Sequence, residues 1–275
     1  MSDDLVILVP LDGRAAALPA LSVAKVFAEL EGAPVRILHV TEQALPAAEL
    51  ARRLGLGAMS PRGAGVESRT GEPAAAILAA ARDLRARLIV LCLHTAPGSP
   101  ADAVGATALA VLRGASCPVI LVNPTRALGD WRLRKVLLPH EGTPATSDAV
   151  KPGAELARRA GAELLVLVVA ATGGPVPQAR GSIASPFYLD QPQHEWPAWA
   201  GEFIERLACV CPLDDLRVRL LLGRGTPSSE ILRVAREEAA DLIILAWKGE
   251  WAPEHAETLK AVVREATCPT MVVRV

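Results

Sequence analysis

One pattern of segments occurs twice along this chain, and that repeat limits the folds open to it. Residues 86–121 read as an apolar strand, a loop, a helix and a second apolar strand that starts at Cys117-Pro118. The same order recurs over residues 241–272, where the last strand starts at Cys268-Pro269. With 275 residues, the chain is long enough for two average domains. We therefore interpret it as a duplicated domain.

The spacing between matching residues predicts where the copies begin and where they differ. At the end of the first apolar segment, three positions have a similar residue 129 positions later. The pairs are Pro10 and Pro139, Asp12 and Glu141, and Gly13 and Gly142. The offset is 154 between Gly71-Glu-Pro73 and Gly225-Thr-Pro227, so 154 − 129 = 25 extra residues lie in the second copy. We expect domains at 1–125 and 132–275, with an insertion at about 170–200.

Apolar runs alternate with helical patterns, which predicts the fold class. Runs such as Leu5–Pro10 and Val35–Val40 are continuous, as in strands covered on both sheet faces. Helices are expected between them, over Ala15–Leu30, Gln43–Leu56 and Ala74–Leu84. The alternation favours an α/β fold with two tandem, open, parallel five-stranded sheets and helices on both faces.

Composition excludes several classes of function. A net charge of −1 leaves no basic footprint for nucleic acid or an anionic membrane. We expect no leader at Met1-Ser-Asp-Asp4, and no apolar run is long enough to span a bilayer. Five scattered cysteines suit reduced thiols, so we expect a cytoplasmic protein. Neither Cys209-Val-Cys211 nor His194-Glu195 has further ligands nearby, so no metal site is expected. No motif names a catalytic residue.

The inserted segment Phe187–Trp199 holds the single tyrosine and two of the five tryptophans. Two interpretations stay open. It forms a proline-rich cover that packs Trp196 and Trp199 onto the body before a helix at Gly201–Leu207, or it is a lid or partner-docking strip, since Trp and Tyr favour contacts.

An ordered set of motifs resembles the universal stress protein family. These motifs are Val9-Pro-Leu-Asp-Gly13, the Gly-x-Pro that precedes an Ile-Leu helix, Asp241-Leu-Ile-Ile244, and the Cys-Pro-Val-x-x-Val of 117–122. The resemblance implies strand order 3-2-1-4-5 in each copy, with a ligand beyond the carboxyl ends of strands 1 and 4. It also implies pairing through strand 5, here within the chain between Cys117–Val122 and Cys268–Val273. A homodimer beyond that pairing stays open.

Nucleotide-binding members of the family that this chain resembles have a sequence pattern of Gly-x-x-Gly, nine further residues, and then Gly-Ser or Gly-Thr. Glycines allow close approach to phosphate, and the last one opens a helix that favours an anion. In the first copy Gly105 is present, but Cys92 and Thr95 replace the two upstream glycines. The resemblance implies an ATP or AMP site at Pro10, Asp12, Val40, Gly105, Ala106 and Thr107. Asp12 would face adenine, or would simply be a turn residue. His39 and His94 are expected to be strand-end side chains.

The second copy departs further from the nucleotide pattern. Its loop is three residues shorter, and a glutamate stands where phosphate would bind. Tryptophan beside the loop could fill the cleft. We interpret this second site as degenerate, with equivalent positions Glu141, Val169, Trp247, Gly249, Ala256 and Glu257.

Three functions remain. The first is a non-catalytic stress-response binding or regulatory module whose second site is degenerate. The second is an ATP- or AMP-binding switch with slow hydrolysis that uses only the first cleft. The third is a carrier of an apolar ligand in clefts that have lost their glycines. The altered glycine pattern favours the first function over the second.

Overall fold

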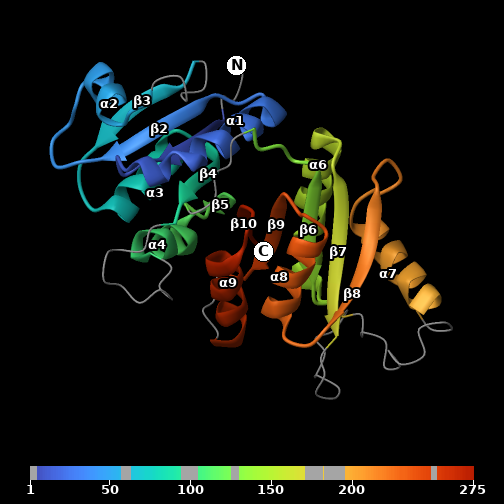
Figure 1. The fold of residues 1–275 in the computed structure, drawn as a ribbon. Coiled ribbons are helices and arrows are strands. Elements are labelled where there is room, and N and C mark those ends of the chain that lie inside the picture. Colours follow the sequence, from blue (N-terminus) through green and yellow to red (C-terminus); the bar gives the residue numbers. More distant parts are fainter. Residues whose placement is uncertain are drawn as a thin grey trace. The chain divides into compact units, whose positions relative to one another are not determined.

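Two compact units make up the computed structural model of this chain (Figure 1). The structure describes residues 5–56, 63–93, 105–124, 130–170, 182, 196–248 and 253–275. The first unit comprises Met1–Arg132 together with Ala266–Arg274, and the second comprises Leu133–Glu265 with Val275. The last strand of the second sequence repeat therefore groups with the first unit.

The first unit contains the predicted parallel sheet. Its strands are β1 (Val6–Pro10), β2 (Val35–Val40), β3 (Gly65–Arg69), β4 (Ala86–Cys92) and β5 (Val119–Val122), in the order β3-β2-β1-β4-β5. This is the expected order 3-2-1-4-5. A further strand, β10 (Thr270–Arg274), pairs antiparallel with β5 and places Met271 opposite Ile120. The α/β class is confirmed, and the antiparallel strand adds to the parallel order.

Helices join these strands with bounds close to those expected, with one exception. They are η1 (Ala15–Ala17), α1 (Pro19–Glu31), α2 (Ala47–Arg53), α3 (Pro73–Asp83) and α4 (Ala106–Gly114). The expectation of a helix over Gln43–Leu56 was wrong at its start. Pro46 is the N-cap of α2, and a proline disfavours helical backbone in the residue before it, so the helix begins after Pro46.

The second unit repeats the arrangement with four strands among its described residues. These are β6 (Lys135–His140), β7 (Glu163–Ala170), β8 (Val218–Arg224) and β9 (Leu242–Trp247), in the order β9-β6-β7-β8 and all parallel. Pro139 lies opposite Leu167, just as Pro10 lies opposite Leu38 in the first unit. Both residues of the pair differ by 129 positions between the units, so the register of strands 1 and 2 is the same in both copies.

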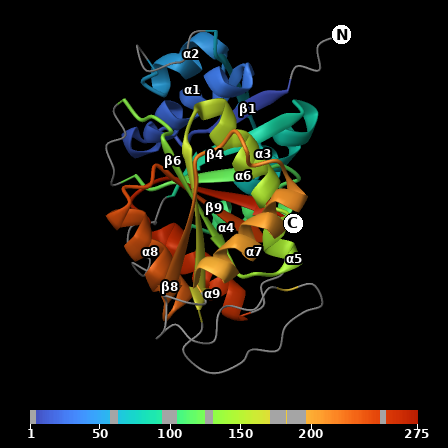
Figure 2. The ribbon, with the colours of Figure 1, turned by 90° about the vertical axis from the view of Figure 1, so that its right-hand side faces the viewer.

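The helices of the second unit lie on both sides of its sheet. They are α5 (Pro144–Ser147), α6 (Val150–Ala160), α7 (Trp196–Val210), α8 (Pro227–Glu237) and α9 (Pro253–Glu265). Figure 2 views this sheet near its edge, with α6 and α7 on one side and α8 on the other. Helices on both faces bury both faces of the strands, which explains why the strand sequences are continuously apolar.

Helix α7 begins earlier than the sequence indicated. The expected start was Gly201, but the helix starts at Trp196, inside the segment interpreted as a proline-rich cover. Trp199 packs on Phe203 with ring centroids 5.0 Å apart. Residues 187–195 of the insertion lie outside the described residues, so the lid or docking interpretation stays a prediction.

A left-handed residue follows the third helix of both copies. Arg85 after α3 has φ 51°, and Ala239 after α8 has φ 52°. These residues are 154 positions apart, the same offset as the two Gly-x-Pro motifs. Non-glycine residues seldom adopt positive φ, so finding the same unusual turn twice supports a duplicated backbone.

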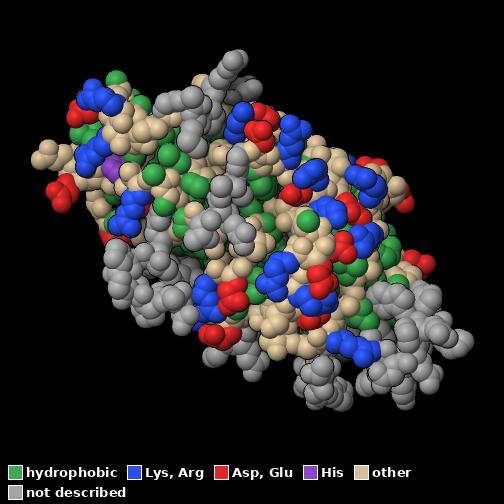
Figure 3. Space-filling model, in the orientation of Figure 1, with side chains coloured by type: hydrophobic (Ala, Val, Ile, Leu, Met, Phe, Trp, Pro, Cys, Tyr) green, Lys and Arg blue, Asp and Glu red, His purple; other side chains and the backbone are tan. Residues whose placement is uncertain are grey.

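Charges of both signs cover the face of the molecule drawn in Figure 3, where Lys and Arg side chains are interspersed with Asp and Glu. Among the helices that the structure describes, none is long and apolar enough to cross a membrane. The described Lys and Arg side chains therefore do not gather into a single basic surface on this face.

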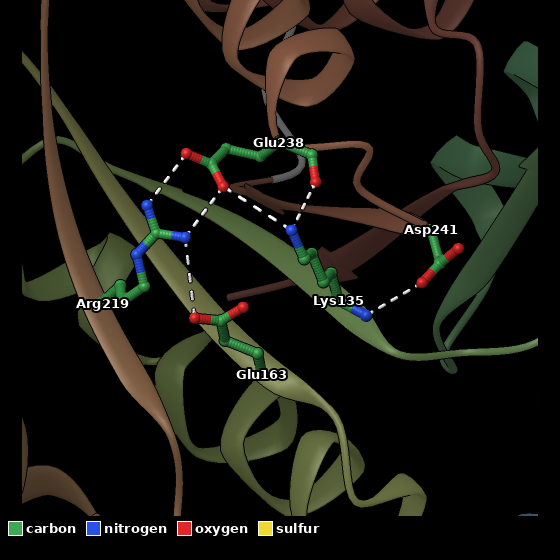
Figure 4. Close-up of polar contacts among 5 residues, drawn as sticks. All are labelled: Lys135, Glu163, Arg219, Glu238 and Asp241. Carbon is green, nitrogen blue, oxygen red and sulfur yellow. Dashed lines mark hydrogen bonds and ion pairs between the residues drawn. The ribbon is translucent and has the colours of Figure 1, made fainter.

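An ion-pair network joins the amino ends of the second unit's strands (Figure 4). The Arg219 guanidinium donates to both carboxylate oxygens of Glu238 at 2.8 and 2.9 Å, which lowers the pKa of Glu238. Lys135 Nζ donates to the Glu238 carbonyl at 2.8 Å, and Glu163 lies 3.7 Å from Arg219. Lys135 and Glu163 are the first residues of β6 and β7. The network lies at the strand starts, away from the carboxyl ends where ligands bind in such folds.

Asp241 is the member of this network with the largest expected effect on stability. Its Oδ2 accepts the backbone N–H groups of Arg134 and Lys135, each at 2.9 Å, and so ties the start of β6 to the start of β9. Asp241→Ala should lower the free energy of unfolding by about 2 kcal/mol, because two amides lose a charged acceptor. Asp241→Asn should recover more than half, since its amide oxygen still accepts. Urea unfolding checks this, with the exposed Asp148→Ala as control. An equal loss in the Ala and Asn variants would contradict the backbone bonds as the cause.

Candidate functional site

The carboxyl ends of β1 and β2 bring several predicted site residues of the first unit together. Pro10 ends β1 and Val40 ends β2, and the register places Pro10 beside Leu38. The chain beyond β1 stays along β2, because the Leu11 N–H donates to the Leu38 carbonyl at 2.8 Å. Asp12 and Gly13 therefore lie beside the end of β2, as the sequence predicted for a ligand site.

The Asp12 side chain stabilises its own turn. Its Oδ1 accepts the backbone N–H of Arg14 at 2.9 Å, and its Oδ2 lies 3.4 Å from Arg14 Nε. This is the turn role that the sequence analysis weighed against an adenine-facing role. The carboxylate is 37% exposed, so the same side chain remains accessible from solvent. Gly13 follows with φ +87°, a left-handed conformation that favours glycine.

His39 lies beneath this turn. Its ring is buried, and Nδ1 lies 2.8 Å from the Leu11 carbonyl oxygen. A carbonyl oxygen only accepts, so Nδ1 carries the proton in this bond. A Cβ added at Gly13 would lie 3.6 Å from His39 Cε1, so the ring lies next to the position of Gly13. His39 is thus a strand-end side chain, as expected, and it is also bonded to the candidate site.

Cys92 occupies the end of β4, at the first glycine position of the nucleotide pattern. Its thiol is buried and donates to the Ala17 carbonyl at 3.3 Å. Burial raises the pKa of Cys92 to about 12, so the thiol stays protonated and unreactive at neutral pH. The side chain joins β4 to η1 at the point between strands 1 and 4 where an open sheet of this type binds ligands.

Gly105 opens helix α4, as predicted. It is the N-cap, and Ala106 and Thr107 form the first turn of a nine-residue helix. The first turn of a helix presents backbone N–H groups that favour an anion. Residues 94–104, which include His94 and Thr95, lie outside the described residues, so the interpretations of His94 and Thr95 stay predictions.

In the second unit, the turn after β6 is bonded within the chain. His140 ends β6 and is 2% exposed. Its Nδ1 accepts the Gly142 N–H at 2.8 Å, while the Glu141 N–H donates to Thr146 Oγ1 at 3.4 Å. His140 Nε2 lies 3.3 Å from Ser147 Oγ, whose hydroxyl donates to the Thr143 carbonyl. The two backbone N–H groups that follow β6 therefore both donate hydrogen bonds to side chains at this turn.

These bonds define the protonation of His140. Because Nδ1 accepts an amide N–H, the neutral ring carries its proton on Nε2, which donates to Ser147. This direction means that His140 does not act as a base toward the Ser147 hydroxyl. Phe203 of α7 packs edge-on against the ring, with centroids 5.1 Å apart. Burial lowers the pKa of His140 to about 4, so the ring is neutral at physiological pH.

The other positions of the degenerate site are less informative. Trp247 ends β9 and is buried, and its carbonyl accepts the Val275 N–H at 3.0 Å. Val169 is half-buried on β7. Gly249 lies outside the described residues. Ala256 and Glu257 do not open a helix as Gly105 does, because α9 begins earlier, at Pro253; Glu257 Oε1 lies 3.1 Å from Lys260 Nζ.

Sequence reasoning missed the cluster around His140. The available signal was the offset of 129, which aligns Leu11 with His140 and His39 with Val168. Each copy thus has one histidine at this place, on different strands. Among the residues that the structure describes, no group of His, Cys, Asp and Glu could hold a metal ion. The five cysteines, all described, form no disulfide.

Comparisons with known proteins match both copies of the repeat to one protein family. The model of the universal stress protein family matches residues 58–123 and again 132–274. The chain resembles the crystal structure of a universal stress protein from Archaeoglobus fulgidus DSM 4304, with 16% identity, a TM-score of 0.70, and coverage of 100% of this chain and 99% of that one. It resembles a functionally unknown protein from Pseudomonas aeruginosa PAO1 with 16% identity, a TM-score of 0.68, and coverage of 98% and 92%. No curated protein sequence matches significantly.

These findings agree with the strand order and with the repeated motifs. The two structural likenesses run through both repeats, and at this identity they support the fold. The family model matches well over half of the chain, in both copies, and its second match includes the turn Pro139–Gly142. The chain therefore belongs to the universal stress protein family.

Proposed function

We propose that this protein is a non-catalytic, regulatory member of its family in which the second cleft does not bind nucleotide. The observation that carries this proposal is the turn after β6. The N–H groups of Glu141 and Gly142 donate hydrogen bonds to Thr146 and His140. A ligand that used these N–H groups would have to displace bonds that the chain already makes. N–H donors that already have acceptors within the chain favour the closed form over an open site.

Stoichiometry and turnover test this proposal. Native mass spectrometry with calorimetric titration of ATP, ADP and AMP should give at most one nucleotide per chain. Incubation with ATP should release no phosphate above the buffer rate. Two bound nucleotides per chain would contradict the closed second cleft, and sustained phosphate release would contradict a non-catalytic role.

A second candidate function is adenine-nucleotide binding in the first cleft alone. Two features favour it. The Asp12–Gly13 turn lies at the end of β1 with its carboxylate partly exposed, and α4 starts at Gly105 with its first amides at the carboxyl end of the sheet. Cys92 in place of glycine counts against it, because the thiol takes up space at the end of β4.

Gly105→Asp separates this candidate from the first. Gly105 has φ −53° and ψ 139°, which any residue adopts, and aspartate is a favoured N-cap, so α4 should keep its stability. The partial positive charge at the start of a helix favours anions. The added carboxylate should counteract it, repel phosphate and weaken nucleotide binding at least tenfold.

The matched control is Gly201→Asp, an exposed glycine of α7 with open space around it. Calorimetry of the three proteins measures the effect. If the wild type binds one nucleotide and Gly105→Asp binds it equally well, the first cleft is not the binding site.

A further inference from the structure

We propose that His39 is a positioning residue of the first cleft: by holding the Leu11 carbonyl, it sets the peptide plane that leads into Asp12. The inference rests on the second candidate function, adenine-nucleotide binding in that cleft. Its carrying observation is the 2.8 Å bond between His39 Nδ1 and the Leu11 oxygen, made by a ring that is 6% exposed.

The geometry of the peptide bond explains how His39 acts through another residue. The carbonyl of Leu11 and the N–H and α-carbon of Asp12 lie in one rigid plane. Holding the carbonyl oxygen therefore fixes where the Asp12 α-carbon lies and how its side chain leaves the backbone. A Cβ added at Gly13, the next residue, would lie 3.6 Å from Cε1 of the same ring. The buried imidazole thus bonds to the residue before Asp12 and lies close to the residue after it.

In the second repeat a histidine also bonds to the backbone next to the acidic residue, but it accepts a hydrogen bond instead of donating one. His140 stands at the position of Leu11, and Val168 stands at the position of His39. There the imidazole accepts the Gly142 N–H and so holds the peptide plane that follows Glu141. The first repeat fixes its acidic residue by donating to the plane before it. The two histidines therefore require opposite tautomers, Nδ1–H in His39 and Nε2–H in His140.

The change from a donating to an accepting histidine determines whether the turn amide stays available to a ligand. In the second repeat the histidine uses up the amide of the turn glycine. In the first repeat it uses a carbonyl oxygen, which no phosphate or adenine-ring acceptor could bind. Only the first arrangement supports the acidic residue without taking a turn amide from the ligand.

Substitutions that keep one nitrogen at a time test the proposal. Asparagine places an amide N–H at the position of Nδ1, whereas glutamine places it near Nε2. We expect His39→Ala and His39→Gln to weaken nucleotide binding about tenfold, the effect of one hydrogen bond, and His39→Asn to stay within about threefold of the wild type. Val168→Ala, the same position in the second repeat, is the control for lost volume.

A double-mutant cycle shows whether His39 acts through Asp12. In an Asp12→Ala background, His39→Ala should cause no further loss of affinity, since there is no carboxylate left to position. A purely structural histidine would lower the unfolding midpoint in all variants and leave the affinity of the folded protein unchanged. Additive losses, or rescue by Gln in place of Asn, would overturn the proposal.

A readout without ligand keeps the inference separate from the proposed function. Nitrogen-15 NMR should show the Nδ1–H tautomer for His39 and the Nε2–H tautomer for His140. Amide exchange at Arg14, whose N–H donates to Asp12 Oδ1, should be about tenfold faster in His39→Ala and near wild type in His39→Asn. If the wild type binds no nucleotide, the candidate function fails, and these two results still decide the role of His39. An Nε2–H tautomer for His39, or unchanged exchange in His39→Ala, would overturn it.

Discussion

The second unit should lose about 3 kcal/mol of its unfolding free energy between pH 6.5 and pH 4, because His140 is buried in its neutral form. Its pKa falls from 6.5 in the unfolded chain to about 4 in the folded unit. In this window the unfolded chain binds a proton that the folded unit does not. The contribution of His140 is therefore complete above pH 6.5 and is lost as the pH falls to about 4, at about 1.4 kcal/mol per pKa unit.

His140→Leu isolates this effect, because leucine is the residue at the equivalent position, Leu11, of the first unit. At pH 7.5 the variant should be less stable by about 1–3 kcal/mol, since the Gly142 amide loses its acceptor. Its stability should then fall less steeply with acid than that of the wild type, so the two curves converge near pH 4.

Urea unfolding at pH 7.5, 6.5, 5.5 and 4.5 measures both curves. Carboxylates such as Glu230 and Glu238, whose pKa values are lowered by their arginine partners, titrate in both proteins and cancel in the difference. Fluorescence and circular dichroism should be followed together, because two units need not unfold in one step. Parallel pH curves for wild type and variant would show that His140 is not buried neutral.

The sequence was sufficient for the α/β class and for the start of one helix of the candidate site. Alternating apolar and helical segments predicted the succession of strands and helices, the family resemblance supplied the strand order that the first unit shows, and Gly105 was correctly predicted to open α4. These features succeed because periodicity and helix starts are local. The start of α7 was missed because its first turn contains Pro197, which looked like part of a loop but is common in the first turn of a helix.

The polar bonds of the clefts could not be read from the sequence. The bond from His39 spans 28 residues, and its partner is a backbone carbonyl that no sequence pattern marks. The contact between His140 and Phe203 spans the whole insertion. Such pairs depend on strand register and helix packing. The one sequence signal is the alignment of the two copies at a fixed offset of 129. It places Leu11 and His39 of the first copy at the positions of His140 and Val168 of the second.

Phe203→Ala should destabilise the second unit strongly, with a loss of about 3–5 kcal/mol in the free energy of unfolding. Phe203 is fully buried and contacts both His140 and Trp199. Its removal leaves a cavity against the His140 ring. Water or a polar group that enters this cavity should solvate the ring, so the pKa of His140 should rise toward its ordinary value and the acid dependence should weaken.

The matched control is Leu50→Ala, also fully buried, in α2, the helix that follows the second strand of the first unit as α7 follows the second strand of the second unit. It should cost about 2–5 kcal/mol and leave the titration of His140 unchanged. Nitrogen-15 NMR of His140 across pH 4–7 measures the titration, and urea unfolding measures the stability. Should the pKa of His140 stay near 4 in Phe203→Ala, the walls that keep water from the ring would have to be the strands and the Thr143–Ser147 turn. Should it rise, the longer helix α7, which the second repeat has and the first lacks, is what seals this cleft.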